Sequence, residues 1–363
     1  MSDIPSELFT EILSRLPVQS LLRFRSTSKS LKSLIDSHNF TNLHLKNSLN
    51  FNLILRHNCK LYQLDFPNLT TAVRIKYPLR GTVHLLGSCN GLLCISNGSD
   101  IAFWNPNTRN HHSIPHIIPY SNGCGSAFYQ FADDYKLLRI SRRLVINFLQ
   151  PPPWPHTIVT KVTLFSFKTN SWTLLPEIPY DFLSSETVRV RVENFFHWVM
   201  TGNLGKRILA FNITQDIFNE VPLPDFEEAT CEINYVSVLG KCLCMTVSCN
   251  GTNTFDVWVM KEYGYRDSWC KLFTFVGEWC FNSPLMSLMP LCYSSDRSKV
   301  LLEVEFRGDF MSDPKKKLKK KLFWYYLKSY KVTYVTGIPN FNEAMIYVGS
   351  LLPPSLPIDN IAS

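Results

Sequence analysis

The side chains that could carry out chemistry are a histidine cluster and an acidic pair, and neither has the surroundings that chemistry requires. His111, His112 and His116 lie close together, but no cysteine or carboxylate set stands near them at metal-ligand spacing, so exposed loop histidines are the better interpretation. The pair Asp133-Asp134 has the residue type that acid–base catalysis uses. A strand-like stretch follows it directly, which favours a turn instead.

The glycine motifs also lead to no cofactor and no nucleophile. Gly123-Cys-Gly125 lacks the third glycine of a dinucleotide-binding loop, and the chain has neither a P-loop nor an HExxH pattern. Gly87-Ser-Cys-Asn-Gly91 has Cys89 at its centre, which does not fit the nucleophile elbow of a hydrolase and favours a turn between strands. We therefore predict no catalytic residue, no cofactor and no metal.

Cysteine usage bears on the compartment. The 363 residues include 11 cysteines, an odd number with no CxxC pair, which predicts neither a disulfide framework nor a zinc site and favours a reducing compartment. The longest unbroken apolar stretch, 322–327, is far shorter than the roughly 20 residues of a membrane helix. We expect a cytoplasmic or nuclear protein, or one present in both, with no membrane partner.

The net charge of +8 is concentrated in one place. Six lysines lie between Lys315 and Lys321, interrupted only by Leu318. A nucleic-acid-binding protein usually spreads its cations over a face or a helix, so nucleic acid is not indicated as a partner. The lysine run has two interpretations, a solvated loop and a nuclear import signal, and the loop is favoured.

The first 46 residues have the periodicity of helices. Between Ile4 and Pro17 the apolar residues recur on one 3.6-residue stripe, and two shorter helices are predicted to follow. Three helices of this size bury little surface by themselves, so another surface must cover their apolar stripe. The apolar residues of the three helices are, in order, Leu8, Phe9, Ile12, Leu13 and Leu16; Val18, Leu21, Leu22 and Phe24; Leu31, Leu34 and Ile35.

After residue 50 the period changes to two, and short runs rich in Val, Ile, Leu, Phe, Tyr and Trp alternate with Gly, Pro and Asn turns. One unit recurs about six times, at intervals of roughly forty to fifty residues that become longer where a loop is inserted. The predicted fold is therefore α+β and multidomain: a small three-helix unit, then a mostly-β repeat domain. For the repeat domain a β-propeller of about six irregular blades is favoured, with a packed β-sandwich as the alternative. The copies are 61–65, 101–109, 162–170, 208–214, 255–261 and 322–328.

The N-terminal stretch resembles the F-box of plant F-box proteins. The similarity covers about 42 residues, from Ile4-Pro5 through Glu11-Ile12-Leu13-Ser-Arg-Leu16-Pro17 and Arg23-Phe24-Arg25 to His44-Leu45. It departs from the family pattern at three positions: Ser26 and Ser28 replace a usual Val or Cys, and Leu31 replaces a usual Trp.

The rest of the chain is similar to the kelch-like domain associated with the F-box in that plant family. The matching stretches include Gly87–Cys94, Trp104-Asn-Pro-Asn-Thr-Arg109 and Ile208–Phe211. The resemblance implies three parts: an F-box helical domain at 1–46, an F-box-associated β-repeat domain at 47–350 and a flexible C-terminal tail at 351–363.

The resemblance further implies a non-catalytic adaptor of an SCF-type (SKP–cullin–F-box) E3 ubiquitin ligase. The helices would bind an SKP-type linker protein and, through it, cullin, while the repeat domain would hold an unknown target protein. The uncovered helical stripe supports the first contact independently. By position, the residues that would bind the linker are Pro5, Leu8, Ile12, Leu13, Leu16, Pro17, Leu21 and Phe24.

Two other functions are open at this stage. A propeller hydrolase or glycosidase would need paired carboxylates converging on the central channel, about 5 to 10 Å apart. A binding propeller without ligase activity, lectin-like or specific for nucleic acid, would bind phosphate with a marked salt dependence in its nucleic-acid form.

Overall fold

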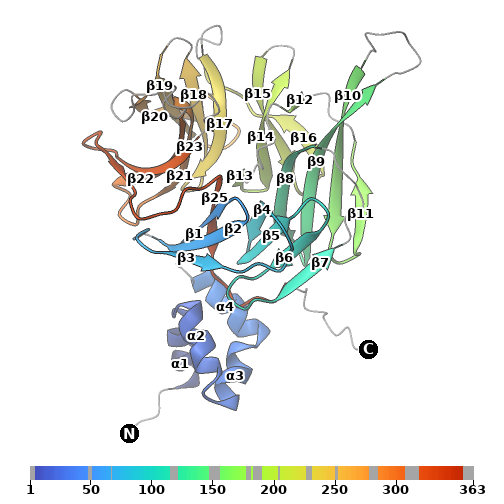
Figure 1. The fold of residues 1–363 in the computed structure, drawn as a ribbon, viewed down its shortest axis with the longest axis vertical. Helices are drawn as coiled ribbons and strands as arrows, with labels where there is room; N and C mark the ends of the chain where they lie inside the picture. Colours follow the sequence, from blue (N-terminus) through green and yellow to red (C-terminus); the bar gives the residue numbers. More distant parts are fainter. Residues whose placement is uncertain are drawn as a thin grey trace.

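A group of helices precedes a ring of β-sheets in the structure, a computed structural model (Figure 1). It describes residues 5–47, 51–66, 68–114, 122–146, 156–176, 181–182, 190–202, 205–225, 231–249, 252–277, 285–306 and 319–354. Within these ranges the helices are α1 (Ser6–Ser14), α2 (Val18–Arg25), α3 (Lys29–Ile35) and α4 (His38–Asn47). No helix of the described residues has both the length and the apolar character of a membrane span.

The fourth helix is a difference from the sequence prediction, which had three. In α4 the buried residues are Phe40, Thr41 and His44, so two of its three inward positions are polar. An apolar stripe is therefore absent, and a search for hydrophobic periodicity passes over this helix.

The described strands form six antiparallel sheets, which are the blades of a propeller. The predicted propeller of about six blades is thereby confirmed, and the β-sandwich alternative was wrong. From the first strand outward, blade 1 has β25 (Glu343–Val348), β1 (Phe51–His57), β2 (Lys60–Asp65) and β3 (Ala72–Ile75). Blade 2 has β4 (His84–Cys89), β5 (Leu92–Ser96), β6 (Ile101–Trp104) and β7 (His111–Ile114). Blade 3 has β8 (Asn122–Phe131), β9 (Asp134–Ile146), β10 (His156–Ser166) and β11 (Ser171–Leu174).

The second half of the ring follows the same plan. Blade 4 has β12 (Asp181–Phe182) and β13 (Val190–Val192), which both pair with β14 (Phe195–Gly202), then β15 (Gly205–Asn212) and β16 (Ile217–Glu220). Blade 5 has β17 (Cys231–Leu239), β18 (Cys242–Cys249), β19 (Thr254–Met260) and, after a 3-10 turn at Arg266–Ser268, β20 (Trp269–Val276). Blade 6 has β21 (Leu285–Tyr293), β22 (Lys299–Phe306), β23 (Lys319–Tyr326) and β24 (Val332–Tyr334).

The ring is closed by strands from opposite ends of the sequence. β25 pairs antiparallel with β1, with Leu53 opposite Ile346 and Leu55 opposite Ala344. Each repeated sequence unit supplies the third strand of its blade, namely β2, β6, β10, β15, β19 and β23. The repeats therefore correspond one to one with the blades.

The core of the propeller lies between the blades. In the described residues, each neighbouring pair of blades shares one buried apolar cluster. In β1, Leu53 and Leu55 pack toward blade 6, whereas Ile54 packs toward blade 2. Both faces of such a strand are buried, which explains its unbroken apolar run. Fully burying one side chain of this size contributes about 1.5–3 kcal/mol.

The structure of the propeller differs from two sequence predictions, one about the cysteines and one about the lysine run. The sequence predicted no disulfide framework, but the structure joins Cys231 to Cys249, which are directly opposite on β17 and β18. The predicted loop does not include the end of the lysine run, because Lys319, Lys320 and Lys321 begin strand β23. Lys320 pairs with the buried carboxylate of Glu303 at 2.8 Å. Residues 315–318 lie outside the described residues.

Candidate partner-binding site

The four helices form a small cluster whose starts are set by local sequence. Pro5 and Pro17 precede α1 and α2, where the missing proline N–H costs no helical hydrogen bond. Ser28 caps α3, and its Oγ accepts a hydrogen bond from the N–H of Leu31 at 3.1 Å. The short connections keep the helices packed against each other.

The interior of the cluster is apolar and includes one residue from the far end of the chain. Leu351, which follows β25, is 8% exposed and packs among the helices. The region from 351 on, expected to be a flexible tail, thus begins with a packed residue; residues 355–363 lie outside the described ranges. The other buried members are Leu13, Val18, Leu21, Ile35 and Phe40, with Leu16, Leu22, Leu31 and Leu34 partly buried around them.

One buried histidine ties α4 to the end of α1. The Nε2 atom of His44 lies 3.0 Å from the carbonyl oxygen of Leu16. Within the described ranges its Nδ1 atom has no hydrogen-bond partner. Burial lowers the pKa of His44, which favours a neutral ring that donates through Nε2. Nearby, Asn47 donates from Nδ2 to Ser14 Oγ at 2.8 Å.

The outer side of the cluster exposes large apolar side chains. Leu8 is 57% exposed and Ile12 53% exposed, one turn apart on α1, while Phe24 on α2 is 41% exposed. Phe9, beside Leu8, is 38% exposed. We call Leu8, Phe9, Ile12 and Phe24 the exposed apolar face. Exposed apolar side chains gathered on a small domain are candidates for contact with a partner.

The structure divides the predicted linker-binding residues into two groups. Leu8, Ile12 and Phe24 lie on the exposed apolar face, with Pro5 and Pro17 exposed at the starts of their helices. Leu13 and Leu21 are inside the cluster and Leu16 is partly buried. Phe9 was not among the predicted contacts, although it belonged to the predicted stripe. The predicted stripe of five apolar residues is wide enough that one edge faces the helical interior and the other faces outward. The spacing of the residues alone does not show which of them lie on which edge.

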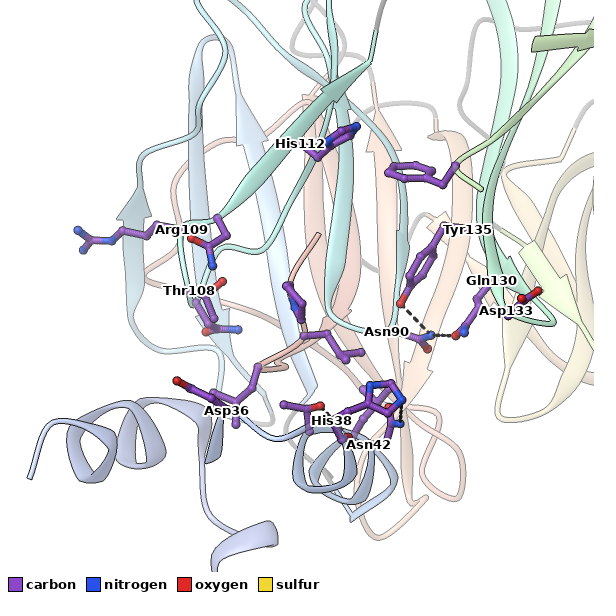
Figure 2. A pocket seen from close by; sticks show the side chains of 18 of the residues that line it. Asp36, His38, Asn42, Asn90, Thr108, Arg109, His112, Gln130, Asp133 and Tyr135 are labelled. Atoms are coloured by element: carbon purple, nitrogen blue, oxygen red, sulfur yellow. Dashed lines mark hydrogen bonds between the residues drawn. The ribbon is translucent and has the colours of Figure 1, made fainter. Parts of the chain in front are cut away.

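A groove of about 1390 Å³ separates the helices from one side of the propeller (Figure 2). His38 and Asn42 of α4 lie on one side, with Asn42 Nδ2 at 2.9 Å from His38 Nε2. Asn90, Gln130 and Tyr135 of blades 2 and 3 lie on the other. Asn90 donates a hydrogen bond to Gln130 Oε1 and a longer one, at 3.4 Å, to the Tyr135 hydroxyl.

Two ion pairs lie in the lining of this groove. Arg25 donates to both carboxylate oxygens of Asp36, at 2.5 and 2.9 Å. The Nζ atom of Lys168 donates to a carboxylate oxygen of Asp133. Besides these two pairs the lining includes the exposed guanidinium of Arg109, together with amides, hydroxyls and apolar groups.

The histidines, the acidic pair and the glycine motif that were candidates for chemistry lie in strands and turns of the propeller. His111 and His112 are exposed and adjacent on β7, so they point to opposite sides of the strand, and His116 lies outside the described residues. Asp133 and Asp134 form the predicted turn into β9, where Asp134 accepts hydrogen bonds from Ser166 Oγ at 2.6 Å and Lys168 N at 2.9 Å. Gly91 and Asn90 form the predicted turn between β4 and β5, both with positive φ. In the described part of the chain, no cluster of His, Cys, Asp and Glu could hold a metal ion.

A cluster of short helices followed by a closed six-bladed ring defines the class of protein, an F-box with an attached propeller. The family profile of the F-box domain matches residues 1–43, and that of the F-box associated beta propeller domain matches residues 47–353. The chain belongs to this family of F-box proteins, as its resemblance to the plant members indicated.

Relatives in Arabidopsis thaliana support the same assignment. The chain is 30% identical to F-box protein CPR1, over 97% of this chain and 89% of the relative. It is 29% identical to F-box protein At4g22390, over 86% of this chain and 83% of the relative.

Among solved structures the chain is similar to YjhT, with 10% identity, a TM-score of 0.45 and coverage of 78% of this chain and 94% of that one.

Proposed function

We propose that the protein is the substrate-recognition adaptor of an SCF-type E3 ubiquitin ligase. The helices bind an SKP-type linker protein and through it cullin, and the propeller binds the protein to be ubiquitinated. The adaptor makes and breaks no bonds. It acts by proximity, because holding a target beside the ubiquitin carrier raises the effective concentration of the reacting groups.

The observation that carries this proposal is the exposed apolar face of the F-box. Leu8 and Ile12 remain more than half exposed although other leucines of the same helices complete an interior. Protein–protein interfaces concentrate their binding energy in a few such anchors, each costing about 2 kcal/mol or more when truncated. A partner with an apolar groove fits this face, as amphipathic helices are generally recognised.

The structure changes which substitutions test the contact. Leu13→Ala would open a cavity inside the cluster, so a loss of binding would not separate contact from folding. Leu8→Ser combined with Ile12→Ser removes apolar surface only from the outside.

We expect the double variant to bind a purified SKP-type linker at least about 100-fold more weakly in calorimetric titration. Val73→Ser is the matched control, because Val73 is 58% exposed on the outer strand β3. It should bind as the unmodified protein does. If the double variant keeps its thermal stability and its full affinity, linker binding through this face is wrong.

A further inference from the structure

The motif Trp104-Asn-Pro-Asn-Thr-Arg109 has no role in the proposed contacts, yet its first asparagine is fully buried. Trp104 ends β6 inside the cluster shared by blades 1 and 2. Asn105, the next residue, is 0% exposed. A fully buried amide must have its hydrogen bonds satisfied, so its partners indicate what the motif does.

The two ends of the Asn105 side chain have different partners. Its Oδ1 accepts from the N–H of Asn107 at 2.9 Å, which shapes the turn into β7. Its Nδ2 donates to the carbonyl oxygens of Ser350 at 3.0 Å and Leu352 at 2.8 Å, about 245 residues away in sequence. The oxygen therefore builds a local turn, and the nitrogen holds a distant segment. We call residues 349–352 the connector.

Other groups of blade 2 contact the connector and Tyr347, which lies just before it on β25. Asn107 Nδ2 donates to the Tyr347 hydroxyl at 2.7 Å, and that hydroxyl donates to the carbonyl oxygen of Gly91 at 3.1 Å. A Cβ atom on Gly91 would lie 2.1 Å from Ser350 Oγ, so only glycine leaves room for the connector here. The close approach and the hydrogen bonds define one position for this backbone.

On its other side the connector enters the F-box. Leu351 lies among the buried leucines of the helices, and a Cβ atom on Gly349 would lie 3.4 Å from Val18 Cγ2 and 3.3 Å from Asn107 Nδ2. The connector thus touches α2 and the blade 2 turn within three residues.

We infer that Asn105 is a positioning residue that clamps the connector, so that the propeller supplies part of the F-box interior and fixes the helices relative to the ring. Opening the helices then exposes Leu351 and strains the hydrogen bonds of Asn105, so the clamp raises the free energy of local unfolding of the helices. The clamp is formed within this chain and does not depend on the partner that the helices bind.

Hydrogen exchange of the full chain tests the clamp with Asn105→Asp. The aspartate keeps the oxygen that accepts from Asn107 but loses both donors, and it places a carboxylate against two carbonyl oxygens. We expect amides of α1 to α4 to exchange at least about tenfold faster, while strands of blades 4 and 5 keep their rates.

Asn212→Asp is the matched control. Asn212 ends the third strand of blade 4, its Oδ1 accepts from the N–H of Thr214 at 2.9 Å, and its Nδ2 donates only within its own turn, to Gln215 at 3.0 Å. Both turns also close with the same backbone bond, Arg109 N to Asn105 O and Asp216 N to Asn212 O. Helix exchange unchanged in Asn105→Asp, or raised equally in both variants, would overturn the role of Asn105.

A second pair of variants applies where Asn105→Asp lowers protection throughout the propeller. Leu351→Ser removes the connector's apolar contact with the helices without altering the propeller turns, and Leu352→Ser changes a partly exposed neighbour. Leu351→Ser should again accelerate helix exchange about tenfold, and Leu352→Ser should leave it within about twofold of the unmodified chain. Equal exchange in these two variants would refute the clamp.

Discussion

The helices and the propeller bury their apolar side chains in different ways. Each blade shares a cluster with both neighbours, so the ring covers its own core once β25 pairs with β1. The helical cluster includes Leu351 from outside and leaves Leu8 and Ile12 exposed. The ring therefore completes its own interior, whereas the F-box needs Leu351 from outside the helices and keeps an exposed apolar face.

The largest predicted effect breaks the ring itself. A chain that ends at Asn342 lacks β25, including the buried Ala344, Met345 and Tyr347, and also lacks Leu351. The loss of these side chains and of a whole strand approaches the total stability of an ordinary protein, about 5–15 kcal/mol. We expect no cooperative thermal unfolding, measured by circular dichroism. The control chain, which ends at Pro354, should unfold like the full chain. If the chain ending at Asn342 has the same unfolding midpoint as the chain ending at Pro354, the prediction is wrong.

The second prediction compares one core truncation in each region. Trp198→Ala in blade 4 should cost about 3–5 kcal/mol, and Leu21→Ala in the helices about 2–5 kcal/mol. The Leu21 variant should lose helical signal in the far ultraviolet before the near-ultraviolet signal of the propeller tryptophans, because its damage is local. Urea unfolding followed in both ranges checks this, and coincident curves for Leu21→Ala would show that the regions never separate.

The third prediction uses pH. Burial lowers the pKa of His197, in blade 4, to about 4, whereas in the unfolded chain it is about 6.5. Between these values the unfolded chain binds the extra proton, so stability is full above pH 6.5 and falls, by at most about 3 kcal/mol, as pH decreases toward 4. His44 acts in the same direction in the helices.

Urea unfolding between pH 7 and pH 4.5 measures this dependence, with His197→Gln as the comparison. The variant should show a shallower loss of stability on acidification, whatever its stability at pH 7. An unchanged slope would mean that another group controls the acid sensitivity.

The smallest predicted effect concerns the Arg25–Asp36 pair at the surface of the F-box. Both side chains are 41% exposed, and exposed ion pairs contribute about 0–1 kcal/mol even with two hydrogen bonds. Asp36→Asn should therefore lower the free energy of unfolding by less than about 1 kcal/mol in urea titration at low salt. A larger loss would show that this pair, rather than the apolar interior, holds α2 and α3 together.

Much of the fold was predictable because the relevant signals are local. The third strand of every blade is a short apolar run that includes an aromatic residue and is followed by a turn, so the six repeats in the sequence correspond to six blades. Pro17 and the spacing of the leucines predicted where the first two helices lie in the sequence. Helix α4 was not predictable in the same way, since its inward residues Thr41 and His44 are polar. The pairing of Cys231 with Cys249 depends on strand register, which cysteine spacing does not encode.

The site was less predictable than the fold. The sequence located the apolar stripe but not its two edges, because only the packing of α1 against α4 and the connector turns Leu13 inward and leaves Phe9 outside. The clamp was out of reach, since Asn105 and Leu352 are far apart in sequence and a turn motif gives no sign of a distant partner.

The ring closure orders events during synthesis on the ribosome. The edge of β1 and the interior of the F-box stay incomplete until residues 343–351 have been translated, although α1 emerges first. A message interrupted late in translation therefore yields a chain with both an open sheet edge and an unfinished helical interior, a form that aggregation and proteolysis remove readily. Closure of the ring and completion of the helical interior therefore depend on the same short segment, β25 and the connector.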